Sequence, residues 1–269
     1  MDRALPMETV TKILLAINEL LSLYKQGALG GEIMPEDANP KLDRDTDESY
    51  LYFTLPMALN YQRNSYTLWE AANKTYNDSD TAAIFSPAAV VDMSIEQLQT
   101  KMLKHKVAIQ PNKHPQIWMQ LSKTFHGFGG SVKSFFASQN YSVVAIKNYM
   151  ITHKKLFPYL SGSKIMNYWL YVMEQYTTAR FTDREHISIA PDTHVIQASI
   201  KLGLINEADI TAPNIREHVS DLWSKILSGT GLCPIDVHTP LWLWSRGKFS
   251  VEIGSSTNKN STCFELVYE

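Results

Sequence analysis

Hydrophobic residues recur at helical spacing along almost the whole chain. A clear example lies between Glu8 and Lys25, where Gly27 follows the last of these apolar side chains: Val10, Ile13, Leu14, Ile17, Leu20, Leu21 and Tyr24. This spacing places them on one face of an amphipathic helix. Further helices are predicted over residues 50–63, 65–77, 94–107, 114–126, 141–154, 163–177, 191–203, 213–228 and 236–245. The fold class is therefore predicted to be all-α.

Three segments differ in character along the chain. Residues 1–45 combine the first helix with an acidic loop, and the glycine, proline and acidic residues of 28–48 indicate a flexible surface connection. Residues 46–246 form the helical core. Residues 247–269 change pattern, because Phe249–Ile253 and Cys263–Val267 flank a run of Gly, Ser, Thr and Asn. This tail is predicted to form a β-hairpin.

The charges are unevenly distributed. Between Glu96 and Glu174 the chain carries ten lysines and no Asp or Glu over 77 residues. The whole chain has 25 Lys and Arg and 27 Asp and Glu, so the part outside this block has 15 basic residues and all 27 acidic ones. A long block of one charge attracts a polyanion and releases its counterions, and this block therefore favours a nucleic acid as the partner.

Several other classes of protein are disfavoured. The apolar stretch from Ile13 to Leu23 is interrupted by polar residues and is too short for a membrane span. Cys233 and Cys263 are the only cysteines, too few for a disulfide framework or a four-thiolate cluster. The eight histidines are dispersed, without the paired spacing of a zinc hydrolase. We expect a soluble cytoplasmic protein without a membrane partner, a metal or another cofactor.

Two short segments concentrate residues that can do chemistry. In Phe157–Lys164 a predicted helix ends, a turn containing Gly162 intervenes, and the next helix begins with Lys164 in its first turn. Amide groups of such a turn can hold a phosphate. In Ile189–Val195, Pro191 suits the first helical position and Asp192 the next, where the helix dipole favours a carboxylate. His194 is predicted to have a capping or packing role.

These segments resemble the helix-hairpin-helix DNA glycosylases, and within them the archaeal 8-oxoguanine glycosylase/lyase branch. The turn ending in Lys164 resembles the hairpin that presents the catalytic lysine, and Pro191–Val195 resembles the segment with the catalytic aspartate. Gly231–Trp242 is similar to the start of the branch's C-terminal helix, and Leu59–Gln62 to an early helix. The likeness covers residues 50 to 246 and implies two helical lobes with a cleft between them.

The resemblance implies a role for each matching residue. Lys164 would attack the sugar as a neutral amine and form a Schiff base, while Asp192 would stabilise the cationic transition state. The flipped base would lie among residues that stack on it or read its edge: Gln62, Tyr168, Asp236, His238 and Trp242. The DNA phosphate would bind the hairpin at Ser161, Gly162 and Ser163. We expect a monomer that acts on duplex DNA without an obligate protein partner.

The sequence departs from the branch in two places. The hairpin contains one glycine, Gly162, where the family usually has more. Asp236 also stands where the branch tends to have His, and His238 where it has an aspartate, which changes the hydrogen bonds offered to a base. Two alternatives therefore stay open. One is excision of a bulky phage-type base, such as glucosylated hydroxymethylcytosine, in antiviral defence, and the other is a non-catalytic DNA-binding module.

Overall fold

The computed structural model describes residues 5–30 and 34–253, and within these ranges the chain is helical, with no β-strand. Most α-helices begin and end within a few residues of the predicted positions, which confirms the all-α class. The α-helices are α1 (Met7–Lys25), α2 (Asp47–Thr54), α3 (Ser65–Asn77), α4 (Pro87–Val91), α5 (Ile95–Lys104), α6 (His114–Gly127), α7 (Val132–Ser138), α8 (Val143–Thr152), α9 (Ser163–Tyr176), α10 (Thr193–Lys201), α11 (Ile215–Leu227) and α12 (His238–Arg246).

Short 3₁₀ turns connect several of these helices. They are η1 (Pro35–Asp37), η2 (Pro56–Leu59), η3 (Ala82–Phe85), η4 (Arg184–His186), η5 (Glu207–Thr211) and η6 (Pro234–Val237). The helix predicted over residues 50–63 is divided, because Pro56 lacks the amide hydrogen that would continue α2. Residues 249–253 form a turn and irregular backbone, so the first arm of the predicted hairpin is not a strand. The second arm lies outside the described residues.

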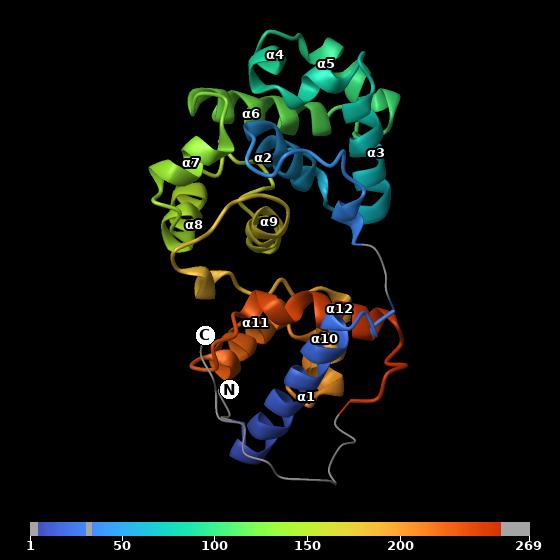
Figure 1. The fold of residues 1–269 in the computed structure, drawn as a ribbon, viewed down its shortest axis with the longest axis vertical. Coiled ribbons are helices and arrows are strands. Elements are labelled where there is room, and N and C mark those ends of the chain that lie inside the picture. The colour runs from blue at the N-terminus through green and yellow to red at the C-terminus, as the bar shows by residue number, and fades with distance from the viewer. Residues whose placement is uncertain (1–4, 31–33, 254–269) are drawn as a thin grey trace.

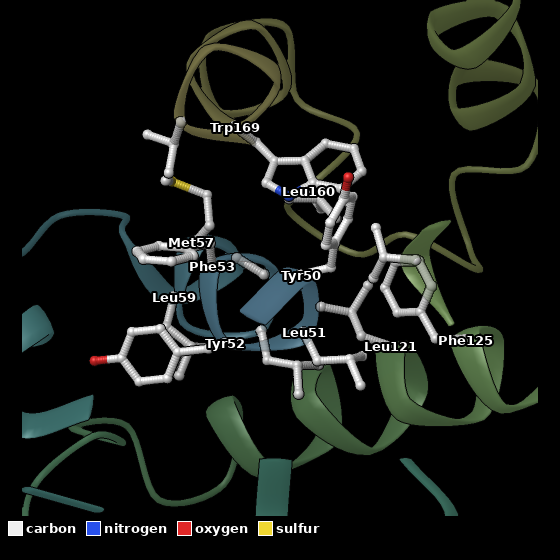
Figure 2. Close-up of a cluster of buried hydrophobic side chains, with 14 of the residues drawn as sticks. Tyr50, Leu51, Tyr52, Phe53, Met57, Leu59, Leu121, Phe125, Leu160 and Trp169 are labelled. Carbon is white, nitrogen blue, oxygen red and sulfur yellow. The ribbon is translucent and has the colours of Figure 1, made fainter. Parts of the chain in front are cut away.

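Helix α2 lies at the centre of the larger cluster of buried side chains. Figure 2 shows its aromatic residues between α9 on one side and α6 on the other. The indole of Trp169 on α9 reaches α2 and donates to the hydroxyl of Thr54 at 2.9 Å. Trp118 is fully buried and donates to the carbonyl of Ile84 at 2.7 Å. The indole donors of Trp169 and Trp118 are therefore satisfied inside the core.

The second cluster joins the first helix to the last three. Side chains of α1, α10, α11 and α12 form it, among them Ile17, Trp223 and Leu241. The indole of Trp223 donates to the hydroxyl of Ser199 on α10 at 3.0 Å. Figure 1 shows the two groups of helices, α2–α9 above and α1 with α10–α12 below. Within the described ranges no helix has both the length and the apolar character needed to cross a membrane.

The acidic segment predicted to be flexible is partly buried. Glu36 has only 1% of its surface exposed. The backbone amide of Met34 donates to Asp37 at 2.8 Å, and this bond closes η1. The prediction of a surface connection is wrong at this point, because Tyr168 and Tyr176 of α9 donate hydrogen bonds to the carboxylates of Glu36 and Asp37.

Candidate functional site

A cavity of about 570 Å³ lies where the two groups of helices meet. It brings together six of the predicted site residues, two of them on α9 and two on α12: Gln62, Lys164, Tyr168, Asp192, His238 and Trp242. Further polar and aromatic residues line the same space, among them Tyr66, His194, Arg216 and Arg246. The cavity therefore combines a lysine, a carboxylate and aromatic rings, as the resemblance implies.

The turn before α9 sets the position of Lys164. Gly162 is the N-cap of α9, and its carbonyl accepts from the amide of Met166 at 2.8 Å. A side chain at Gly162 would place its Cβ 3.3 Å from the carbonyl oxygen of Tyr159, closer than a comfortable contact. Tyr159 itself adopts φ +62°, in the left-handed region. Gly162 has φ −69°, which any residue can adopt, so the left-handed position of this turn is occupied by a tyrosine.

Fewer backbone amides of the turn are available to a phosphate than the sequence predicts. The amide of Ser161 donates to the carbonyl of Phe157 at 3.0 Å, and that of Gly162 to Tyr159 at 3.1 Å. These two amides are therefore already used within the turn. No side chain caps α9, so amides from Ser163 onward are the ones placed to donate to an anion.

The surroundings of Lys164 favour its neutral amine. Burial lowers the pKa of Lys164, and the positive charge of Arg216 lowers it further, against the opposing effect of Asp192. The side chain retains access to solvent through the cavity, yet protein surrounds it densely enough for desolvation to dominate. A lysine with a lowered pKa offers more of the unprotonated form that acts as a nucleophile.

Asp192 begins the next helix. It is the N-cap of α10 rather than the second residue of that helix, and its Oδ1 accepts from the amide of Val195 at 3.0 Å. An N-cap carboxylate is fixed in place and stabilised by the helix dipole. Its charge acts on both Lys164 and His238 in the cavity.

His238 lines the cavity and has one unpartnered ring nitrogen. The residue is 7% exposed, and Nδ1 has no hydrogen-bond partner among the described residues. Burial lowers the pKa of His238 to about 4, with Asp192 opposing this change and Lys164 adding to it. The imidazole is therefore neutral at pH 7 and can offer one donor and one acceptor. A buried polar atom without a partner beside a cavity is a candidate ligand contact.

Aromatic rings form the remaining walls. The ring of Tyr168 lies 5.5 Å from that of His238, measured between centroids. The guanidinium of Arg246 lies over Trp242 at 4.8 Å and over Tyr66 at 4.9 Å, and it donates to the Tyr66 hydroxyl at 2.8 Å. Such a stack holds the rings in place and adds positive charge to the wall.

Gln62 lies in a turn and not in the predicted helix. Helical structure ends at Leu59, and Gln62 adopts φ +51° in the turn before α3. A non-glycine residue in the left-handed region is uncommon and costs free energy, and such residues cluster at functional sites. The backbone here directs Gln62 into the cavity wall.

Asp236 is the predicted site residue that the structure places elsewhere. Its two carboxylate oxygens accept from Arg184 at 3.0 and 2.6 Å, and one also accepts from the amide of Cys233 at 2.9 Å. Arg184 in turn donates to Glu174 at 2.7 Å. Asp236 does not line the cavity. Of the exchanged Asp and His, only His238 lines the cavity.

Arg184→Met is expected to lower the free energy of unfolding by about 2–3 kcal/mol. The substitution leaves Glu174, whose side chain is 7% exposed, and Asp236 without their shared cation. The loss is smaller than the roughly 3–5 kcal/mol of a fully buried pair because Arg184 is itself partly exposed. Urea denaturation at pH 7 measures it, with Arg184→Lys as the matched variant that keeps the charge. An unchanged midpoint would show that the carboxylates find other partners.

The carboxyl of Glu36 lies behind Tyr168, and its environment makes stability depend on pH. Burial raises the pKa of Glu36 from 4.5 to about 7, with the negative charge of Asp37 acting in the same direction, against a hydrogen bond from Tyr168. The indole nitrogen of Trp69 is close enough to influence this pKa without meeting hydrogen-bond geometry. The folded protein therefore disfavours the ionised carboxylate.

Glu36→Gln is expected to raise the free energy of unfolding more at pH 8 than at pH 4.5. Between pH 4.5 and 7 the folded state binds the Glu36 proton more than the unfolded state does, so the contribution of Glu36 to stability falls as pH rises. Above pH 7 this loss is complete, and ionised Glu36 lowers the free energy of unfolding by about 3 kcal/mol. Urea denaturation across this window measures it, with exposed Glu70→Gln as control. Parallel curves for wild type and Glu36→Gln would contradict the raised pKa.

Sequence reasoning missed several residues of the cavity. Arg216 and Tyr66 carry no motif, and only the fold brings them to Lys164. Arg246 follows Trp242 by four positions on α12, which is the spacing of a stacked pair on one helix face. His194, predicted to have a capping or packing role, packs its ring against Trp242, makes a 3.2 Å contact from Nδ1 to the hydroxyl of Ser245, and also lines the cavity.

The lysine block does not form one continuous positive surface. Lys104 pairs with Asp78 and Asp80 at 2.7 and 2.9 Å, and Lys133 pairs with Asp45 at 2.9 Å. These acids lie outside the block in sequence, yet the fold places them beside it. Electrostatic attraction to a polyanion is therefore weaker than the sequence count indicates.

No protein-family model matches the sequence, and no curated protein matches it. The case for a function consequently depends on the geometry of the cavity.

Proposed function

We propose that the protein is a DNA N-glycosylase with abasic-site lyase activity and a two-lobed helix-hairpin-helix glycosylase fold. The observation that carries the proposal is the pairing of Lys164, whose pKa is lowered by burial, with the N-cap carboxylate of Asp192 in one aromatic-walled cavity. A pure binding module has no need of this combination. An amine nucleophile beside a fixed carboxylate suits attack on a sugar carbon that becomes cationic.

The reaction follows from the residues of the cavity. The target nucleotide leaves the helix and its base enters the cavity, where Tyr168 and Trp242 supply ring faces and His238 and Gln62 supply polar groups. Neutral Lys164 attacks the anomeric carbon while the N-glycosidic bond breaks and the base takes a proton. Asp192 stabilises the positive charge that develops on the sugar.

The lyase step uses the covalent product of the first step. Opening of the sugar ring converts the bond between Lys164 and the anomeric carbon into a protonated Schiff base. Loss of a proton from the neighbouring sugar carbon then expels the 3′ phosphate oxygen and nicks the strand. Water hydrolyses the remaining imine and restores the amine of Lys164. The backbone amides of the first turn of α9, from Ser163 onward, would hold a phosphate of the same strand.

The resemblance names 8-oxoguanine as the excised base, and a bulky modified base is the second candidate. The cavity volume of about 570 Å³ favours the second candidate, because pockets of this size accommodate ligands larger than a single base. The absence of Asp236 from the cavity also removes one base contact that the branch pattern implies.

Borohydride trapping tests the proposal. Labelled duplexes carry 8-oxoguanine, glucosylated hydroxymethylcytosine, a plain abasic site, or no modification. We expect a reduced covalent adduct with the abasic duplex and with whichever modified base is the substrate, and none with the unmodified duplex. No adduct on any duplex, together with intact duplex binding, would reject the lyase and leave a monofunctional glycosylase or a binding module.

A further inference from the structure

Glu36 contacts the cavity wall from behind, from a part of the chain that lies outside the glycosylase resemblance. The short turn η1 places two carboxylates against α9, where each accepts from a tyrosine. Tyr168 donates to Oε2 of Glu36 at 3.1 Å, and Tyr176 donates to Oδ1 of Asp37 at 2.9 Å. The two tyrosines lie eight residues apart, on one face of α9.

Tyr168 connects Glu36 to the cavity. Its ring lines the cavity one helical turn after Lys164 and lies 5.5 Å from the imidazole of His238. Its hydroxyl points the other way, to Glu36. Met34 and Pro35, which precede Glu36, also line the cavity. A continuous set of contacts therefore runs from the η1 carboxylate through one tyrosine to the base-facing histidine.

A carboxylate is an unfavourable choice for simple packing at this position. Glu36 is 1% exposed, and Oε1 has no hydrogen-bond partner in the described parts of the chain. Replacing such a buried charged group by an apolar residue of similar volume is often neutral or stabilising. Its retention is explained if the hydroxyl of Tyr168 must be held in one direction, because Oε2 of Glu36 is the acceptor that holds it.

We propose that Glu36 is a positioning residue for the base-binding wall: it holds the hydroxyl of Tyr168, and so keeps the Tyr168 ring against His238. This inference rests on the proposed glycosylase function. The wall contacts the base, whereas Lys164 reacts with the sugar. Loosening the wall should therefore affect release of a base more than cleavage at a preformed abasic site, where no base is bound.

The test measures two single-turnover rates in each variant, base release and strand cleavage at an abasic site. The first rate divided by the second is then compared with the wild-type ratio. Glu36→Met removes the acceptor with similar volume, Glu36→Gln keeps an acceptor oxygen, and Tyr168→Phe removes the same bond without altering Glu36. We expect the ratio to fall about tenfold in Glu36→Met and to return to within about twofold of wild type in Glu36→Gln. In a Tyr168→Phe background, Glu36→Met should have no further effect.

A second readout needs no substrate. The imidazole nitrogen signals of His238, assigned with a His238→Gln protein, should shift in Glu36→Met and stay in place in exposed Glu70→Gln. An unchanged ratio in folded Glu36→Met, an equal loss in Glu36→Gln, or a static His238 signal would overturn the inference. Failure of the proposed function looks different, because wild type would then lack both reactions while the His238 signal still responds to Glu36→Met.

Discussion

In the Lys164→Gln protein, covalent trapping and base release are expected to fall to background, a loss of more than about 10³-fold. Glutamine has no amine that can add to the anomeric carbon, so both the glycosylase and the lyase step lose their nucleophile. Duplex binding should change little, because one charge at the cavity contributes only part of the attraction to DNA. Single-turnover excision and borohydride trapping measure the two losses.

Lys155→Gln is the matched control for this experiment. Lys155 is exposed in the same hairpin, so its substitution removes the same charge without touching the cavity. An adduct of wild-type intensity in Lys164→Gln would assign the nucleophile elsewhere. Lys147 would be the first candidate, because burial also lowers its pKa, although its amine donates to Asn167 and to the carbonyl of His186, each at 3.0 Å.

Asp192→Asn is expected to reduce excision by about 10²–10³-fold while leaving the fold intact. Asparagine caps a helix as well as aspartate does, so the bond to the amide of Val195 can persist. What disappears is the negative charge that stabilises the cationic sugar. Single-turnover excision measures the loss, and the urea midpoint checks the fold.

Asp192→Ala separates the two roles of this residue. It removes both the charge and the cap, so it should match Asp192→Asn in activity and in addition lose about 1 kcal/mol of stability. A non-catalytic module gives a different result, since Asp192→Asn would then bind duplex DNA as well as wild type or better. Equal excision by wild type and Asp192→Asn would exclude Asp192 from the chemistry.

Local patterns predicted most of the helices, because apolar spacing and turn residues mark where each one begins and ends. Helices α3 and α9 begin and end within one residue of their predicted positions, and α3 has a capping side chain at Asn64. Helices α4 and α7 have five and seven residues, too short for a 3.6-residue period to be recognised. The predicted helix over 50–63 was wrong beyond Thr54, where Pro56 imposes a different turn.

The candidate site was predictable where its chemistry is local. Lys164 and Asp192 each lie at a helix start, so turn signals in the sequence indicated both. Arg216 and Glu36 could not be found in this way, because their relation to Lys164 and Tyr168 exists only after helices from distant parts of the chain have packed. The position of Asp236 was missed for the same reason, since its partner Arg184 lies 52 residues away.

The packing of α1 against α10–α12 has a consequence for the order in which the chain can fold during synthesis. Helices α2–α9 contain nearly all of their own cluster, so they can pack as they leave the ribosome. Helix α1 is made first but lacks its packing partners until α12 is complete. Asp192 and His238 belong to that late-forming half. The lysine would therefore be in place before its carboxylate, and the cavity would be assembled only after α10 and α12 have been made and packed.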